Sequence, residues 1–311
     1  MKHDIVLTVP IYATAVEALD QAFTVHRLWQ AKHRSAFFAE IRDRVRAIAT
    51  GAYPVNAELM DELPKTEIIA TQSVGVDHID LAAARQRGIA VTNTPDVLTE
   101  DVADIGMSLV LAVARRLISA DRHVRSGSWL KGNLPFATKV GGATMGVLGL
   151  GRIGLAIAKR AEAFGMTIVY YGPREKPGIP YRRYASLIEM AKAADYLMVS
   201  CPGGPETRHL VNAEVLAALG PEGVVINIAR GSVIDESAMV KALHEGKLGG
   251  AGLDVFADEP RVPEALFGME HVVLLPHIGS ATHATRAAMG QLVVDNLKAH
   301  FAGKPLLTRV G

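Results

Sequence analysis

The order of apolar and polar positions along residues 1 to about 95 predicts short strands that alternate with helices. Four apolar, partly β-branched runs are typical of buried strands: Ile5–Ile11, Val45–Thr50, Glu67–Ser73 and Ile89–Asn93. Apolar residues recur at helical spacing in Ala31–Ile41 and Leu81–Gln86. Because strands that alternate with helices pair in parallel, this part of the chain is expected to form a parallel sheet covered on both faces.

A different pattern follows the break at Thr94-Pro95-Asp96. Thr99 is a suitable N-cap, and the acidic residues Glu100 and Asp101 that follow it favour a long helix that extends to about Ala120. Residues 122–142 lack a regular pattern and contain Trp129 and Phe136. A long irregular segment with aromatic residues is typical of a lid or a subunit contact, and the pattern is equally compatible with a loop packed on its own domain.

From residue 144 the alternation of strands and helices resumes. The predicted strands are Thr144–Leu148, Thr167–Tyr171, Tyr196–Cys201, Val224–Ile228, Ala251–Val255 and Val272–Leu275. One long helix is expected over Thr282–Phe301. The sequence therefore predicts an α/β protein in which a Rossmann-type domain is inserted into the first parallel-sheet unit.

A glycine-rich turn joins the strand Thr144–Leu148 to a helical pattern that begins at Leu155. Gly149 permits a tight turn, Gly151 lets a pyrophosphate approach the backbone, and Gly154 lets the helix pack closely on the strand. The free N–H groups and the positive dipole end of the helix favour an anion there. Strand, glycines and helix occur in the required order, which predicts a dinucleotide site; a purely structural turn in another doubly wound fold is the alternative.

Composition narrows the class of protein. Hydrophobic residues make up 49% and charged residues 21% of the 311 residues, which is typical of a globular enzyme. The net charge of +1 provides no field that would attract nucleic acid or a membrane surface, so neither partner is expected. The single cysteine, Cys201, excludes an internal disulfide framework and a site with several cysteine ligands, and no metal is predicted. It ends an apolar run and is expected to pack in the core.

The chain begins without the apolar region and small-residue cleavage site of a signal peptide. The longest apolar helical stretch, Ile105–Ala114, is about half of a bilayer span. A cytoplasmic location is therefore expected.

Polar residues follow three of the late predicted strands. Arg230 follows Val224–Ile228, Asp254 and Glu259 come at and after the end of Ala251–Val255, and His277 follows Val272–Leu275. Each alone has an ordinary explanation as a solvated loop residue or a turn cap. Because the carboxyl ends of parallel strands meet at one edge, where ligands bind in open α/β sheets, the three groups are expected to converge.

These groups suit a carbonyl that lies next to a carboxylate. Arg230 has a planar fork that holds the carboxylate and polarises the carbonyl oxygen. His277 is suited to exchanging a proton near neutrality, and Glu259 would favour its protonated form and fix its orientation. Asp254 is placed to accept from a nicotinamide carboxamide. The predicted chemistry is hydride transfer from a nicotinamide with His277 as the proton donor.

At this point the chain resembles the D-2-hydroxyacid dehydrogenase family over essentially its whole length, and most closely the glyoxylate/hydroxypyruvate reductase branch. The motifs that carry the resemblance are Ser73-Val74-Gly75-Val76-Asp77, Thr94-Pro95-Asp96-Val97-Leu98-Thr99, Gly149-Leu150-Gly151-Arg152-Ile153-Gly154, Ile226-Asn227-Ile228-Ala229-Arg230-Gly231, Gly252-Leu253-Asp254-Val255-Phe256 with Glu259-Pro260, and Pro276-His277-Ile278-Gly279-Ser280. In that family the matched Arg, Glu and His form the catalytic set.

The resemblance implies further features. The substrate domain would be flavodoxin-like and comprise 1–96 and 281–311, and the dinucleotide-binding domain would comprise 97–280, with a dimerisation helix and loop at about 99–142. The substrate would contact Val74, Gly75, Arg230, His277 and Ser280, together with Trp129 contributed across a homodimer. The residues expected to line the cofactor are Thr99, Gly149, Leu150, Gly151, Arg152, Ile153, Gly154, Gly172, Arg174, Cys201, Pro202, Thr207, Ile228, Ala229, Arg230, Asp254, His277 and Gly279.

The end of the second strand of the Rossmann unit bears on the choice of cofactor. An acidic residue there binds the ribose 2′-OH of NAD, whereas this chain has Gly172 followed by Pro173 and Arg174. NADPH is therefore predicted over NADH, with Arg174 on the 2′-phosphate. NADP-using reductases of the resembled branch tend to place Ser-Arg or Asn-Arg at this point. Glu175 supports the alternative interpretation, because its carboxylate would restore NAD use if the side chain turned back to the ribose.

The predicted function is NADPH-dependent reduction of glyoxylate and hydroxypyruvate to glycolate and D-glycerate. The first alternative retains this chemistry with 2-ketogluconate, pyruvate or a phosphorylated 2-oxoacid as the substrate. A formate dehydrogenase is disfavoured because its relatives lack the carboxylate that Glu259 supplies. A further alternative is a cofactor-sensing, corepressor-like binding protein.

Overall fold

The computed structural model describes residues 2–310, and the chain forms two compact units, Met1–Leu98 with Ser280–Gly311 and Thr99–Gly279. Within the described residues of the first unit, five parallel strands pair in the order β2-β1-β3-β4-β5. Their bounds are β1 Asp4–Leu7, β2 Thr24–Arg27, β3 Val45–Thr50, β4 Ile68–Thr71 and β5 Ala90–Thr92. This order is that of a flavodoxin-like doubly wound sheet, as predicted.

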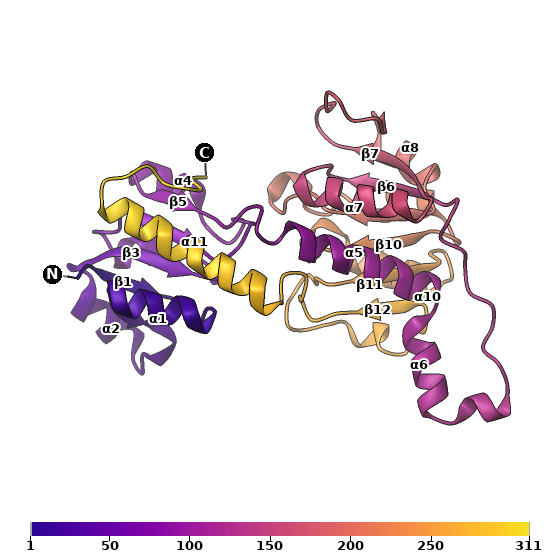
Figure 1. The fold of residues 1–311 in the computed structure, drawn as a ribbon, viewed down its shortest axis with the longest axis horizontal. Helices are drawn as coiled ribbons and strands as arrows, with labels where there is room; N and C mark the ends of the chain where they lie inside the picture. The colour runs from indigo at the N-terminus through magenta and orange to yellow at the C-terminus, as the bar shows by residue number, and fades with distance from the viewer. Residues whose placement is uncertain (1, 311) are drawn as a thin grey trace. The chain divides into compact units, whose positions relative to one another are not determined.

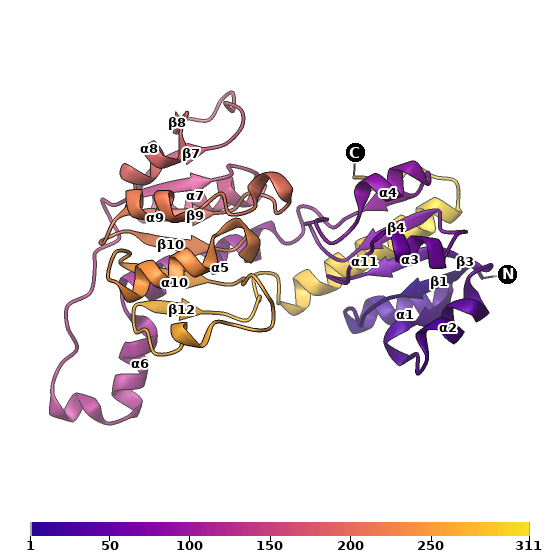
Figure 2. The same cartoon turned by 180° about the vertical axis from the view of Figure 1, so that it is seen from behind.

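Helices cover both faces of this sheet (Figures 1 and 2). Leu7 packs with residues of α1 (Ala13–Ala22) and α11 (His283–Phe301) on one face. Val6 points to the opposite face and packs with residues of α2 (Arg34–Ile41), α3 (Ala57–Glu62) and α4 (Leu81–Gln86). Because successive side chains of a strand point to opposite faces, the nearly unbroken apolar strands of this sheet supply both cores.

Over residues 99–279, seven parallel strands pair in the order β12-β11-β10-β9-β6-β7-β8. Their bounds are β6 Thr144–Leu148, β7 Thr167–Tyr171, β8 Arg182–Tyr184, β9 Tyr196–Val199, β10 Val224–Asn227, β11 Gly250–Leu253 and β12 Val272–Leu274. Six of them have the Rossmann order, with β6 at the point where the winding reverses. The predicted α/β class with two parallel sheets is confirmed.

The helices of this unit also form two layers (Figures 1 and 2). α5 (Thr99–Ala114) packs against α7 (Arg152–Ala163) on one face, and α8 (Leu187–Lys192), α9 (Ala213–Leu219) and α10 (Glu236–His244) lie on the other. Among the described residues of either unit, no helix has the length and apolarity needed to cross a bilayer.

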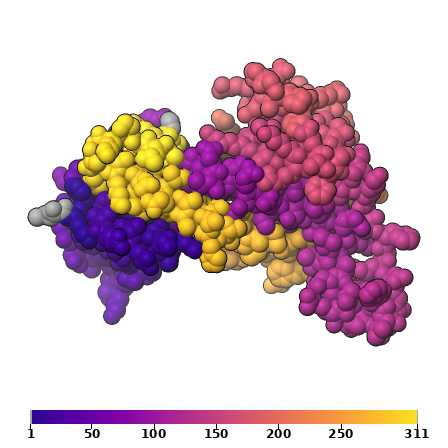
Figure 3. Space-filling view, in the orientation of Figure 1, coloured from indigo at the N-terminus to yellow at the C-terminus, as the bar shows by residue number. Residues whose placement is uncertain are grey.

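One predicted element is wrong in its extent. The helix expected to continue to Ala120 ends at Ala114, because Arg116 adopts the left-handed conformation with φ of 51°, and α6 (Leu117–Arg125) begins after it. α6 and the 3-10 turn Ser128–Lys131 extend from the sheet of the second unit as an arm, which is also seen in the space-filling view (Figures 1 and 3). The large apolar side chains exposed on this arm are Leu117, Ile118, Val124, Trp129 and Leu130, and Phe136 is exposed just after it.

The edge strands β2 and β8 were not predicted. β2 has the sequence Thr-Val-His-Arg and β8 has Arg-Arg-Tyr, so neither shows the apolar run of a central strand. An edge strand pairs on one side only and tolerates polar side chains, which removes the signal on which the prediction relied.

Candidate active site

The glycine turn has the geometry that a dinucleotide requires. A side chain at Gly149, whose φ is 93°, would lie 2.6 Å from the Cα of Cys201, and one at Gly154 would lie 2.4 Å from the carbonyl oxygen of Gly149. A side chain at Gly151 would meet no atom within 4 Å. Two of the glycines thus permit close packing of turn, strand and helix, while the third leaves open space at the start of α7, which fits a pyrophosphate.

Other predicted cofactor residues lie around this turn. Leu150 is buried within it, and Arg152 and Ile153 begin α7. The Thr207 hydroxyl donates to the carbonyl oxygen of Pro202 at 2.8 Å and holds the segment that follows β9. Thr99 begins α5, Ile228 and Ala229 are buried just after β10, and Gly172 directly follows β7. Except for Thr99, whose helix begins at residue 99 itself, these residues follow strands of the sheet at or near their carboxyl ends.

Cys201 is buried at this edge, and burial raises the pKa of its thiol to about 11. The side chain is therefore a neutral packing group near neutrality, as its apolar sequence context predicted. Sequence reasoning missed the neighbouring Ser200, whose hydroxyl donates to the carbonyl oxygen of Gly149 at 2.9 Å and secures the turn.

Arg230 lies in the loop that follows β10, and side-chain hydrogen bonds and close packing hold this loop in place. The buried Asn227 accepts from the backbone N–H of Ala229 at 3.0 Å and donates to the carbonyl oxygen of Arg230 at 3.0 Å. A side chain at Gly231 would lie 1.9 Å from the carbonyl carbon of Phe256, so only glycine lets this loop meet the one after β11. Neither Asn227 nor Gly231 was singled out as functional, although both belong to the recognised motif.

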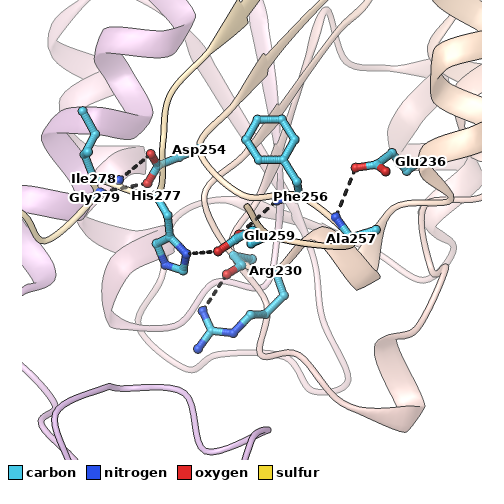
Figure 4. A network of polar contacts seen from close by, with 10 residues as sticks. Arg230, Glu236, Asp254, Phe256, Ala257, Glu259, His277, Ile278 and Gly279 are labelled. Atoms are coloured by element: carbon cyan, nitrogen blue, oxygen red, sulfur yellow. Dashed lines mark hydrogen bonds and ion pairs between the residues drawn. The ribbon is translucent and has the colours of Figure 1, made fainter. Parts of the chain in front are cut away.

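His277 and Glu259 form the central contact of the candidate site (Figure 4). Nδ1 of His277 lies 2.7 Å from Oε2 of Glu259, and Oε1 of Glu259 accepts from the backbone N–H of Phe256 at 3.1 Å. The imidazole is 43% exposed and therefore remains accessible to a substrate. Because Nδ1 is engaged by the carboxylate, Nε2 is the nitrogen available for proton exchange.

Charges around Glu259 set its ionisation. Burial alone would raise the pKa of the Glu259 carboxyl, but the hydrogen bond and charge of His277, the Phe256 N–H and the charge of Arg230 outweigh it, and the pKa is lowered from its usual value of 4.5. Glu259 is consequently ionised throughout the neutral range, and its carboxylate is a charged acceptor for Nδ1 of His277.

The turn that carries His277 is held by Asp254. His277 has a φ of 53°, which is uncommon for a residue with a side chain. Oδ1 of Asp254 accepts from the N–H of Ile278 at 2.7 Å, and Oδ2 accepts from the N–H of Gly279 at 2.8 Å (Figure 4). Burial raises the pKa of Asp254, partly offset by these two bonds. Asp254 thus supports the turn that carries His277, and its predicted contact with a nicotinamide carboxamide stays a prediction.

The remaining predicted substrate residues belong to other segments of the chain. Val74 and Gly75 follow β4 in the first unit, where Nδ2 of Asn93 donates to the carbonyl oxygen of Val74 at 2.8 Å, and Ser280 belongs to the same unit. Trp129 is 62% exposed on the arm, and its Nε1 donates to Oδ1 of Asn133 at 3.1 Å. The structure brings the predicted catalytic residues Arg230, Glu259 and His277 together within the unit comprising residues 99–279.

We expect Glu259→Gln to lower kcat/KM for reduction about ten- to a hundredfold, because the charged acceptor of Nδ1 becomes a neutral amide oxygen and the charge-assisted hydrogen bond is lost. Because the imidazole is then held less firmly by Nδ1, kcat should fall more than KM rises. Initial rates over a range of glyoxylate concentrations measure both quantities. Glu236→Gln is the matched control, because Glu236 accepts from the N–H of Ala257 in the same loop. A kcat as high as that of the native protein would remove Glu259 from this role.

A Rossmann turn shaped for a pyrophosphate and an Arg–Glu–His set at the same edge define a dinucleotide-dependent dehydrogenase. The model of the D-isomer specific 2-hydroxyacid dehydrogenase NAD-binding domain matches residues 107–279. The chain is 50% identical over 307 residues to hydroxyphenylpyruvate reductase of Plectranthus scutellarioides and 49% identical over 307 residues to a glyoxylate/hydroxypyruvate reductase of Arabidopsis thaliana, with 98% of each chain covered in both cases.

A solved structure is similar over the whole chain. It is that of an NADPH-dependent glyoxylate/hydroxypyruvate reductase of Sinorhizobium meliloti in complex with NADP and malonate, with a TM-score of 0.95, 46% identity and coverage of 100% of this chain and 97% of that one. The chain belongs to the D-isomer specific 2-hydroxyacid dehydrogenase family, as the sequence motifs predicted.

Proposed function

We propose that this protein reduces small 2-oxoacids, glyoxylate and hydroxypyruvate, to glycolate and D-glycerate with NADPH. The observation that carries the proposal is the His277–Glu259 contact of 2.7 Å beside Arg230, at the edge of the sheet that holds the glycine turn. The reductase activities of the relatives from Arabidopsis thaliana and Sinorhizobium meliloti support it.

Each side chain then has a defined task. A bound reduced nicotinamide would supply the hydride. Arg230 holds the substrate carboxylate with its planar fork and polarises the carbonyl oxygen. Nε2 of His277 gives its proton to that oxygen as negative charge develops on it, while Glu259 holds the imidazole by Nδ1. The backbone N–H groups of Val74 and Gly75 bind the carboxylate, and Ser280 contacts the substrate.

NADPH preference is supported by the residues that follow β7. Gly172 has no carboxylate to bind a ribose 2′-OH, and Arg174 supplies a cation for a 2′-phosphate. The relative from Sinorhizobium meliloti, which is described as NADPH-dependent, supports the same preference. NADH is expected to be used less well.

We also propose that the unit comprising residues 99–279 binds the cofactor, that the other binds the substrate, and that two copies form a homodimer through α5 and the arm. The exposed apolar side chains of the arm support an interface, because a monomer seldom leaves such a set in water. Trp129 would then border the active site of the partner. A cytoplasmic location stays a prediction.

Initial rates with glyoxylate, measured with NADPH and NADH side by side by loss of reduced-nicotinamide absorbance, test the function. We expect turnover with NADPH and much less with NADH. Turnover that favours NADH would retain the reaction and overturn the cofactor assignment. Glu175 would then be the first residue to test as the one that binds the ribose. Hydroxypyruvate, 2-ketogluconate and 4-hydroxyphenylpyruvate distinguish the substrates. Failure with every 2-oxoacid, combined with peptide binding, would favour a corepressor-like protein.

A further inference from the structure

The edge strand β8 places an arginine beside the residue that ends β7. Nε and Nη2 of Arg183 donate to the carbonyl oxygen of Gly172 at 3.2 and 3.0 Å. β8 pairs with β7 in parallel, with Arg183 opposite Tyr170 and Tyr184 opposite Tyr171. The partly buried guanidinium therefore lies at the carboxyl end of β7, where the adenosine ribose of a dinucleotide binds in this fold.

The segment between Gly172 and Lys176 is held at both ends. Arg183 binds the carbonyl oxygen of Gly172, and the backbone N–H of Lys176 donates to the hydroxyl of Tyr170 at 3.0 Å. The chain that returns to β8 is tied to α7 by the bond from the Tyr181 hydroxyl to Oε2 of Glu162 at 2.5 Å. Arg174 therefore lies in a loop whose anchors are side chains of β7 and β8.

Charge and space at this point both favour an added anion. Residues 172–183 contain the cations Arg174, Lys176, Arg182 and Arg183 and one acid, Glu175. A side chain at Gly172 would meet no atom within 4 Å, so the position that carries the acid in NAD-binding chains is open here. A guanidinium has five N–H donors. Two of those of Arg183, one on Nε and one on Nη2, donate to the carbonyl oxygen of Gly172.

We propose that Arg183 is a specificity-determining residue of the cofactor site. Its guanidinium binds the phosphate on the adenosine 2′ oxygen, and its bonds to Gly172 hold the loop that presents Arg174. The two arginines bind the phosphate as a pair. The preference for NADPH over NADH is therefore retained although Pro173 precedes Arg174, where the resembled branch tends to have Ser or Asn. This inference rests on the proposed use of NADPH.

Binding of 2′,5′-ADP and of 5′-AMP to the full chain, measured by calorimetry, tests the proposal without turnover. The two probes differ by the 2′-phosphate. We expect Arg183→Ala to weaken 2′,5′-ADP about ten- to a hundredfold, as for the loss of a charged hydrogen bond, and 5′-AMP by less than about threefold. Arg183→Gln, which removes the charge and retains an amide donor, should weaken 2′,5′-ADP similarly.

Arg182→Ala is the matched control. Arg182 is the adjacent arginine on β8, is exposed and lies 4.7 Å over the ring of Tyr184. Its removal deletes the same charge, and 2′,5′-ADP binding should change by less than about threefold. In the double variant with Arg174→Ala and Arg183→Ala, the two losses should not add, because both residues contact one phosphate and one loop.

The outcomes separate the two hypotheses. A native protein that binds 2′,5′-ADP no more tightly than 5′-AMP would overturn the NADPH assignment and this inference with it. A native preference for 2′,5′-ADP that survives Arg183→Ala would overturn this inference alone. Equal losses in Arg182→Ala and Arg183→Ala would reduce the effect to general surface charge, and unchanged binding in Arg183→Gln would reduce Arg183 to a structural anchor. Both results contradict the proposal.

Discussion

Replacing His277 with alanine should lower turnover of glyoxylate by about 10²- to 10⁴-fold, the range that general acid–base catalysis supplies. The imidazole is the group placed to protonate the developing alkoxide, because Glu259 engages Nδ1 and leaves Nε2 for the substrate. Binding of the cofactor should weaken far less than turnover falls, since the glycine turn and most of the residues expected to line the cofactor follow other strands of the sheet. Initial rates at saturating NADPH and a calorimetric titration of NADPH measure the two effects.

His244→Ala provides the control for this experiment. His244 lies in the last turn of α10 and has no assigned part in the reaction. Its replacement should leave turnover within about twofold of the native value, as is usual for surface substitutions. If His277→Ala retained native turnover, His277 would not be the proton donor, and the assigned role of Glu259 would fall with it.

Replacing Arg230 with lysine is expected to lower kcat/KM for glyoxylate by at least about a hundredfold. Lysine retains the positive charge but loses the planar fork that holds a carboxylate by two parallel bonds. Nη1 of Arg230 donates to the carbonyl oxygen of Ala229 at 2.8 Å, which fixes the orientation of the guanidinium. Inhibition by oxamate, an unreactive analogue of a 2-oxoacid, should weaken in parallel, because the carboxylate contact is made before the reaction.

Arg261→Lys is the matched control for Arg230→Lys. Arg261 forms an exposed pair with Asp258 at 2.7 Å, adjacent in sequence to Glu259. An exposed ion pair contributes about 0–1 kcal/mol, so this change should have little effect on either quantity. Near-native kcat/KM in Arg230→Lys would show that a point charge suffices and would reject the bidentate role.

The local parts of this site could be predicted from the sequence because each depends on residues close together in the chain. The spacing of Gly149, Gly151 and Gly154 sets the shape of one turn, and apolar runs identify the strands that Arg230 and His277 follow. Parallel strands align their carboxyl ends, so even the convergence of these groups follows from the pattern. The structure shows why residue 154 must be glycine, because a side chain there would lie 2.4 Å from the carbonyl oxygen of Gly149.

Other features depend on contacts between segments far apart in the chain. The edge strand β8, which carries Arg183, has no apolar pattern in its sequence, and this segment becomes a strand by pairing with β7. Asp254 supports the His277 turn across 24 residues.

The sequence by itself determined the fold class, the glycine turn and the polar residues that follow strands β10, β11 and β12, because backbone periodicity and turn stereochemistry are local. Only the tertiary structure decided which nitrogen of His277 meets Glu259, that Asp254 holds the turn of His277, and that Arg183 reaches Gly172. Side-chain hydrogen bonds between distant segments form once packing has brought those segments within about 3 Å, and no spacing along the chain encodes that distance.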